Sequence, residues 1–239
     1  MAEQDKTARI KSALTKAGEK YRDRISLRTA VQAIPYIGGA LDTLLSGHAG
    51  KIQEARFQSF LEELDSRLHR LENIAEVEPD EEFFDFMLNV FDGVLRSKSK
   101  EKRAHFASIV ANQVKNKREW GEADTAIRLL MELSEIHVVV LREALNAPVC
   151  GPPFDGLRVI SLVEQPLGEK NGKRPLALTE VLPEYTNLAL RMACSELASR
   201  ALLHDEGISH WDIGALEYLV TTNLASWFID WISNETHGA

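Results

Sequence analysis

Hydrophobic positions in the first half of the chain recur at helical spacing. The clearest run of apolar side chains is separated by four, three, four, three and four residues, which is the spacing of a heptad-like seam on an α-helix. This run predicts a helix over Lys51–Ala75, whose seam packs either inside a bundle or against a second copy of the chain. The seam consists of Phe57, Leu61, Leu64, Leu68, Leu71 and Ala75.

Other apolar stretches of the first half predict further helices. A basic amphipathic helix is expected over residues 4–28. A short buried helix is expected over Pro35–Ser46, where Gly38 and Gly39 indicate a close backbone approach. More helices are expected to begin at Asp80 and to cover Lys100–Lys117 and Ala123–Leu133, with breaks at Val77–Pro79, Ser97–Ser99 and Gly121.

The second half changes to shorter elements with loops between them. Ser134 is a candidate N-cap for a helix over Ile136–Leu145. A longer helix is expected over Glu184–Leu203, and its inward-facing residues are predicted to be Leu188, Met192, Leu197 and Ala201. The remaining elements are an apolar segment at Leu157–Val163, a helical turn at Thr179–Leu182, a two-stranded ribbon made by Leu202–His204 and Leu216–Thr221, and a closing helix at Thr221–Ile232.

This order of helix, turn, helix, hairpin and final helix is typical of a winged helix-turn-helix. We therefore predict a mostly α-helical fold in two domains. Residues 1–120 are expected to form an N-terminal helical bundle. Residues 121–239 are expected to form a winged-helix-like domain with a short β-hairpin.

The composition fits a globular protein. The chain has 239 residues, of which 44% are hydrophobic and 27% charged. No apolar run reaches the roughly 18 residues that span a bilayer, and the N-terminus lacks the apolar region of an export signal. Cys150 and Cys194 are too few for a disulfide framework or a zinc site. The expected location is the cytoplasm, and peripheral association with the membrane is the open alternative.

Charge is distributed in blocks along the chain. The net charge is −9 over residues 61–95, +7 over residues 96–118 and −10 over residues 119–239, within a total of −8. Such blocks either compensate each other on neighbouring helices or form docking faces. The docking candidates are the seam residues Phe57, Leu61, Leu64, Leu68 and Leu71, and the basic residues Lys98, Lys100, Lys102, Arg103, Lys115, Lys117 and Arg118.

No catalytic, cofactor-binding or metal-binding motif is visible. The sequence lacks a Gly-rich phosphate loop, a G-x-S-x-G elbow, an H-E-x-x-H motif and a Cys-x-x-Cys pair. His204 and His210 flank Asp205 and Glu206, but this composition is more typical of a polar turn than of a metal site. We therefore expect a protein that is not an enzyme and that uses no cofactor, metal or small-molecule substrate.

Two alternative functions arise from other segments. Arg191 and Arg200 of the expected recognition helix are candidates for contact with DNA. The net charge of −10 over residues 119–239 has the wrong sign for neutralising phosphates. The apolar segment that contains Ile34, Tyr36 and Ile37 follows the basic helix 4–28 and is a candidate for membrane insertion.

Three segments resemble a known group of proteins. They are Lys100–Ala107 (K-E-K-R-A-H-F-A), Leu129–Leu145 (L-L-M-E-L-S-E-I-H-V-V-V-L-R-E-A-L) and the closing residues 221–229. Over about residues 98–232 the chain resembles the uncharacterised bacterial Abi-alpha-like family, which is linked to abortive infection. The resemblance implies a helical region, a winged-helix-like end and no known catalytic residue.

Taken together, these patterns predict a non-enzymatic protein-interaction or regulatory component of bacterial phage defence. It is expected to act through a protein partner or by self-association. A membrane-active effector that uses the N-terminal helices and a DNA-binding regulator are the alternatives.

Overall fold

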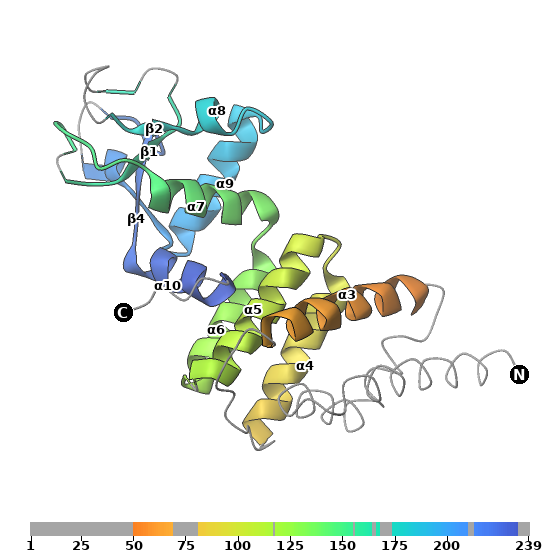
Figure 1. The fold of residues 1–239 in the computed structure, drawn as a ribbon. Coiled ribbons are helices and arrows are strands. Elements are labelled where there is room, and N and C mark those ends of the chain that lie inside the picture. The colour runs from red at the N-terminus through yellow and green to blue at the C-terminus, as the bar shows by residue number, and fades with distance from the viewer. Residues whose placement is uncertain are drawn as a thin grey trace, which may run out of the picture. The chain divides into compact units, whose positions relative to one another are not determined.

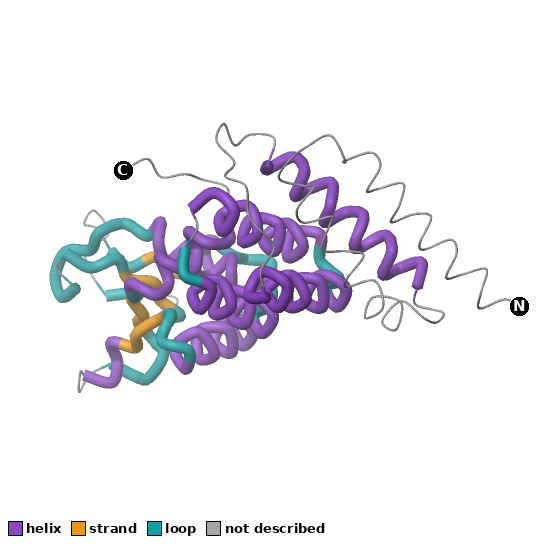
Figure 2. Tube along the Cα trace, turned by 90° about the horizontal axis from the view of Figure 1, so that it is seen from below, coloured by secondary structure: helices purple, strands orange, loops and turns teal. Residues whose placement is uncertain are grey.

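The computed structural model describes residues 50–68, 81–116, 118–154, 156–163, 166–167, 174–209 and 213–233. The chain is mostly helical and carries a small four-stranded sheet (Figures 1 and 2), so the predicted predominance of helix is confirmed. It divides into two compact units. Unit 1 contains the chain up to Glu132 and again from Trp231, and unit 2 contains Leu133–Asp230. The helices expected over residues 4–28 and Pro35–Ser46 lie outside the described residues, as does the break at Val77–Pro79.

Unit 1 is built from helices that share one apolar core. They are α3 (Gly50–Leu68), α4 (Glu81–Arg96), α5 (Lys100–Asn116) and α6 (Trp120–Glu132). Helix α5 packs against the other three, and α4 also packs against α3 and α6 (Figure 1). The largest side chains buried between them are Phe60, Phe83, Phe86, Phe91 and Phe106. Burial of aromatic side chains is the main source of stability in such a core.

The turn between α4 and α5 follows the sequence prediction. Ser97 donates its hydroxyl to the Gly93 carbonyl at 2.7 Å, which closes the last turn of α4. The Ser99 hydroxyl accepts from the backbone N–H of Lys102 at 3.2 Å, so Ser99 caps the first turn of α5. The two serines therefore end one helix and begin the next at the expected break.

The sequence suggested that Gly121 separates two helices, but in the structure Gly121 lies inside α6. Helix α6 begins one residue earlier, at Trp120. The Trp120 ring packs against Phe86 and Phe83, with ring centroids 5.4 and 6.2 Å apart. These aromatic contacts favour helical backbone at Trp120, and glycine is tolerated in the first helical turn.

Unit 2 combines helices with the sheet. Its elements are α7 (Glu135–Asn146), β1 (Val159–Ser161), β2 (Leu176–Ala177), α8 (Leu178–Val181), α9 (Asn187–Ser199), β3 (Leu203–Asp205), a 3₁₀ turn (Glu206–Ser209), β4 (Tyr218–Thr221) and α10 (Asn223–Ile232). Helix α10 begins in unit 2, and its last two residues are grouped with unit 1. The Ser134 cap, the turn at α8 and the closing helix lie where the sequence placed them.

The sheet is larger than the predicted ribbon. The strand order is β2-β1-β4-β3, in which β1 pairs parallel with β2 and antiparallel with β4. Strands β3 and β4 pair antiparallel with His204 opposite Val220, which confirms the predicted hairpin. Strand β4 is central because it also pairs with β1, where Ile160 lies opposite Leu219. The sequence did not indicate β2, which is only two residues long.

Candidate interaction surface

Helix α9 is bounded by caps at both ends. The Thr186 hydroxyl accepts from the Ala189 N–H at 3.2 Å and starts the helix. At the other end, the N–H of Ala201 donates to Ala198 and that of Leu202 donates to Leu197, each at 3.0 Å. This pair of bonds is a Schellman motif, with Ala201 at a φ of 57°. The caps make the helix shorter than the predicted Glu184–Leu203.

One face of α9 is fully buried in unit 2. Leu190, Ala193, Cys194 and Leu197 are spaced three, one and three residues apart and are at most 2% exposed. Burial raises the pKa of the Cys194 thiol to about 12, so this cysteine stays protonated and unreactive near neutral pH. Helices α7 and α8 and strand β3 pack against α9 and cover this buried face.

The opposite face of α9 exposes two large apolar side chains. Leu188 is 68% exposed and Met192 is 57% exposed, one helical turn apart. The sequence prediction placed both of them inward, and that prediction was wrong. Ala201, the fourth residue predicted inward, is also exposed and lies beyond the end of the helix. We call Leu188, Arg191, Met192 and Ser195 the α9 outer stripe.

The cation in this stripe is held in place by an amide. Arg191 donates from Nε to the side-chain oxygen of Asn187 at 3.0 Å. Asn187 in turn donates to the carbonyl of Leu162, just after β1, at 3.2 Å. Asn187 therefore anchors the first turn of α9 and orients the guanidinium beside Leu188 and Met192. Among the described residues, Arg191 has no carboxylate partner in an ion pair.

The predicted docking seam on α3 is part of the core of unit 1. Phe57, Leu61, Leu64 and Leu68 are each at most 6% exposed, and Leu71 lies outside the described residues. The Phe57 ring meets Phe91 of α4 edge to face at 5.1 Å. Of the two packing modes that the sequence left open, the structure shows burial inside the unit. These side chains are covered and do not form a surface patch.

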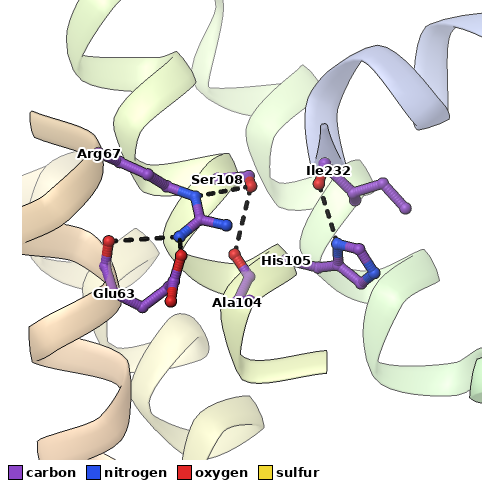
Figure 3. A network of polar contacts seen from close by, with 6 residues as sticks. All are labelled: Glu63, Arg67, Ala104, His105, Ser108 and Ile232. Atoms are coloured by element: carbon purple, nitrogen blue, oxygen red, sulfur yellow. Dashed lines mark hydrogen bonds and ion pairs between the residues drawn. The ribbon is translucent and has the colours of Figure 1, made fainter. Parts of the chain in front are cut away.

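A buried arginine also ties α3 to α5. Arg67 is 8% exposed and donates from Nε to the Ser108 hydroxyl at 3.1 Å. It also forms an ion pair with Glu63 one turn earlier on α3. Ser108 donates to the Ala104 carbonyl at 3.2 Å, and the neighbouring His105 donates from Nδ1 to the Ile232 carbonyl at 2.9 Å (Figure 3). This polar network is directed at the interior of unit 1.

Two of the seven predicted basic docking residues bind backbone carbonyls within unit 1. Lys102 donates from Nζ to the Met131 carbonyl at 2.9 Å, near the end of α6. Arg103 donates to the carbonyls of Ser97, Lys98 and Ser99 at 3.1 Å. A cation is favourable beside Met131 because the last carbonyls of a helix lack intrahelical partners and lie at the negative end of its dipole. Arg103 instead binds the carbonyls of the turn between α4 and α5.

The other residues of the basic block have different surroundings. The Arg118 guanidinium lies 4.9 Å from the centre of the Trp231 ring, which is a cation–π contact. Lys98, Lys100 and Lys115 are exposed, and Lys117 lies outside the described residues. Much of the block thus contributes to packing in unit 1, and three described lysines remain at its surface.

The remaining candidate residues are less informative. Arg200 donates to the Glu196 carbonyl at 3.4 Å, beside the end of α9. Ile34, Tyr36 and Ile37 lie outside the described residues. No helix in the described part of the chain is long and apolar enough to cross a bilayer.

The acidic turn after β3 has a structural role. Asp205 is 6% exposed, and its carboxylate accepts from the backbone N–H groups of Gly207 and Leu216 at 2.9 and 2.8 Å. His204 beside it is exposed, and His210 lies outside the described residues. The described residues contain no group of three or more His, Cys, Asp or Glu side chains arranged to hold a metal ion.

Ser134, His137 and Glu196 lie in a row at the start of α7. The Ser134 hydroxyl is 2.7 Å from Nδ1 of His137, and Nε2 is 2.9 Å from the Glu196 carboxylate. This is the order of groups in acyl-transfer sites. However, the Ser134 backbone N–H also donates to Nδ1 at 3.0 Å, and the Nε2 contact lacks the alignment of a hydrogen bond. The arrangement matches a capping box with histidine in place of Glu or Gln.

No protein-family model matches the chain, and the curated proteins and solved structures contain no detectable similar protein. The resemblance to the Abi-alpha-like family therefore stays a prediction.

Proposed function

We propose that the protein is a non-enzymatic protein-interaction component whose docking surface is the α9 outer stripe. The observation that carries this proposal is the exposure of Leu188 and Met192, at 68% and 57%, on a helix whose other large apolar side chains are at most 2% exposed. Removal of such side chains from water favours association by about 25 cal/mol per Å² of apolar surface. The resemblance to the Abi-alpha-like family supports a role for this interaction in bacterial phage defence.

The composition of the stripe supports a protein partner. Arg and Met are enriched at protein interfaces, and hot spots combine a desolvated apolar centre with a well-positioned Arg. Leu188 and Met192 supply the apolar centre. Arg191 is oriented in advance by Asn187, so binding orders it at a lower entropic cost.

The topology of unit 2 supports a winged-helix-like domain as the carrier of this stripe. Helices α7, α8 and α9 precede the β3–β4 hairpin, and β1 pairs with β4 on its other side. Helix α9 then occupies the place of the recognition helix in DNA-binding proteins of this topology. Helices α3–α6 would form the accompanying helical bundle.

Charge favours a protein over DNA as the ligand of this helix. Residues 133–230 contain seven Lys or Arg against thirteen Asp or Glu, a net charge of −6. Binding to DNA is driven largely by neutralising phosphates with basic side chains. The middle of the outer stripe presents Leu188 and Met192 where a DNA reader would present polar groups to the base edges.

The same features define the chemistry of the partner. It should present apolar side chains to Leu188 and Met192 and a carboxylate to Arg191, since a carboxylate accepts two parallel hydrogen bonds from a guanidinium. A second copy of the chain and an unrelated protein can both meet this description. The experiment below separates them by the mass of the product.

A site-specific crosslink tests the proposal. A photoreactive benzophenone side chain is introduced into the full chain at Met192 or, as a control, at Arg142, which is exposed on α7. After irradiation in the native cells, we expect a protein adduct at position 192 that is absent at position 142. The crosslinked peptide of the partner should contain apolar residues beside Asp or Glu. Adducts with nucleic acid, or equal yields at both positions, would overturn the proposal.

A further inference from the structure

Ser134 is the N-cap residue of α7 and the second residue of unit 2. Its hydroxyl and its backbone N–H both point at one atom, Nδ1 of His137, from 2.7 and 3.0 Å. These contacts stabilise the first turn of α7 in the manner of a capping box. Glu and Gln are the usual residues at the position of His137.

The hydrogen bonds define the protonation state of the ring. A backbone N–H can only donate, so Nδ1 must accept and carries no proton. The proton of the neutral ring is therefore on Nε2, which lies 2.9 Å from the Glu196 carboxylate of α9. A histidine cap differs from a Glu or Gln cap because its accepting atom can itself become a donor near physiological pH.

The surroundings of His137 keep the ring neutral. Its side chain is 7% exposed, and burial lowers its pKa. The Glu196 carboxylate and the Ser134 backbone oppose this shift, and the charge of Arg200 adds to it. Strands β1 and β4 also pack on α7, and they carry no charged residue; Tyr218 is their only titratable one.

We propose that His137 is a proton-operated helix cap: uptake of a proton at Nδ1 turns the acceptor into a donor, so the Ser134 backbone N–H is released and the first turn of α7 opens. The Ser134 hydroxyl can reverse its role and accept from the protonated ring, whereas the backbone N–H cannot. The imidazolium then stays attached to α9 through the Glu196 carboxylate, since their attraction increases when the ring is charged. Acidification thus exchanges a cap on α7 for an ion pair to α9. The effect is independent of what binds to the α9 outer stripe.

Hydrogen exchange measured by NMR on the full chain tests this device. The amide of Ser134 reports the bond to Nδ1 directly. Between pH 7 and pH 5, after correction for the intrinsic exchange rate, we expect its protection to fall about fivefold, the equivalent of losing about 1 kcal/mol of capping energy. His137→Gln restores the usual capping box without a titrating group and should keep its protection at both pH values.

The controls make the result decisive. His204→Gln removes an exposed histidine in β3 and should behave like the wild type. Equal loss of protection in His137→Gln and the wild type, or no loss in the wild type, would overturn the proposal. If His137→Gln does not fold, the wild type alone is sufficient: the Ser134 amide shift must titrate with the midpoint of the His137 ring, and separate midpoints would refute the device.

Discussion

Gly93 of α4 and Phe106 of α5 are so close that no side chain fits between them. A Cβ atom at Gly93 would lie 2.3 Å from Cζ of the Phe106 ring. Phe106 is fully buried, so the ring cannot turn away into solvent. The glycine therefore sets the distance between the two helices that organise the core of unit 1.

The first prediction concerns this contact. Gly93→Ala should lower the free energy of unfolding by about 1–3 kcal/mol because the added methyl overpacks the core. Gly121→Ala is the matched control, since a Cβ there meets nothing within 4 Å. It should be neutral or stabilise α6 by up to about 1 kcal/mol. Urea unfolding measures both, and equal stability of the two variants would show that the helices separate easily.

The second prediction concerns the cap that Lys102 places on α6. Lys102→Met keeps the apolar stem but removes the bond to the Met131 carbonyl, and should destabilise the protein by about 0.5–1 kcal/mol. Lys100→Met removes an exposed lysine from the same helix and should change the stability by less than about 0.5 kcal/mol. Thermal unfolding of both variants checks the difference. A larger effect at Lys100 would mean that the basic block contributes through its surface charge.

The third prediction concerns the end of α9. Ala201 adopts a φ of 57°, a conformation that glycine enters without strain. Because Ala201 is exposed, Ala201→Gly loses no packing and should stabilise the protein by about 1 kcal/mol. Ala198→Gly, inside the same helix, should destabilise it by about 1 kcal/mol. Opposite shifts in melting temperature are expected, and shifts of the same sign would contradict the assigned helix end.

The fourth prediction follows from the lowered pKa of His137. The folded chain takes up this proton less readily than the unfolded chain, whose histidine has a pKa near 6.5. The histidine therefore does not reduce stability above pH 6.5, and it destabilises the folded state progressively as the pH falls below that value. In urea unfolding at pH 7.5 and 5.5, the wild type should lose more stability than His137→Gln. Parallel losses would show that the ring is not coupled to folding.

Local patterns were sufficient for much of the fold. The seam from Phe57 to Leu68 predicted α3, Ser134 predicted the start of α7, and the serines at 97 and 99 predicted the break before α5. In each case the signal lies within a few residues of the feature. Strand β2 could not be found in this way, because it consists of two residues whose pairing partner lies sixteen positions earlier at Ile160 and Ser161.

The candidate surface was harder to predict because α9 carries two apolar rows. One contains Leu188 and Met192, and the other contains Leu190, Cys194 and Leu197. Spacing alone does not choose between them. The choice depends on α7, α8 and β3, which cover only the second row. Likewise, the sequence shows that Lys102 and Arg103 are basic but not that backbone carbonyls near the end of α6 and in the turn before α5 lie within their reach.

The central claim is that the α9 outer stripe binds a protein, and one comparison tests it most directly. The yield of the protein adduct at position 192 is measured in three backgrounds: the wild type, Leu188→Glu and Leu88→Glu. Leu88 is a matched control because it is also exposed, at 39%, but lies on α4 in unit 1. Loss of an apolar hot-spot residue costs about 2 kcal/mol or more, which weakens affinity roughly 30-fold. We predict that Leu188→Glu abolishes the adduct and that Leu88→Glu leaves it unchanged, whereas an unchanged yield in Leu188→Glu would contradict the account.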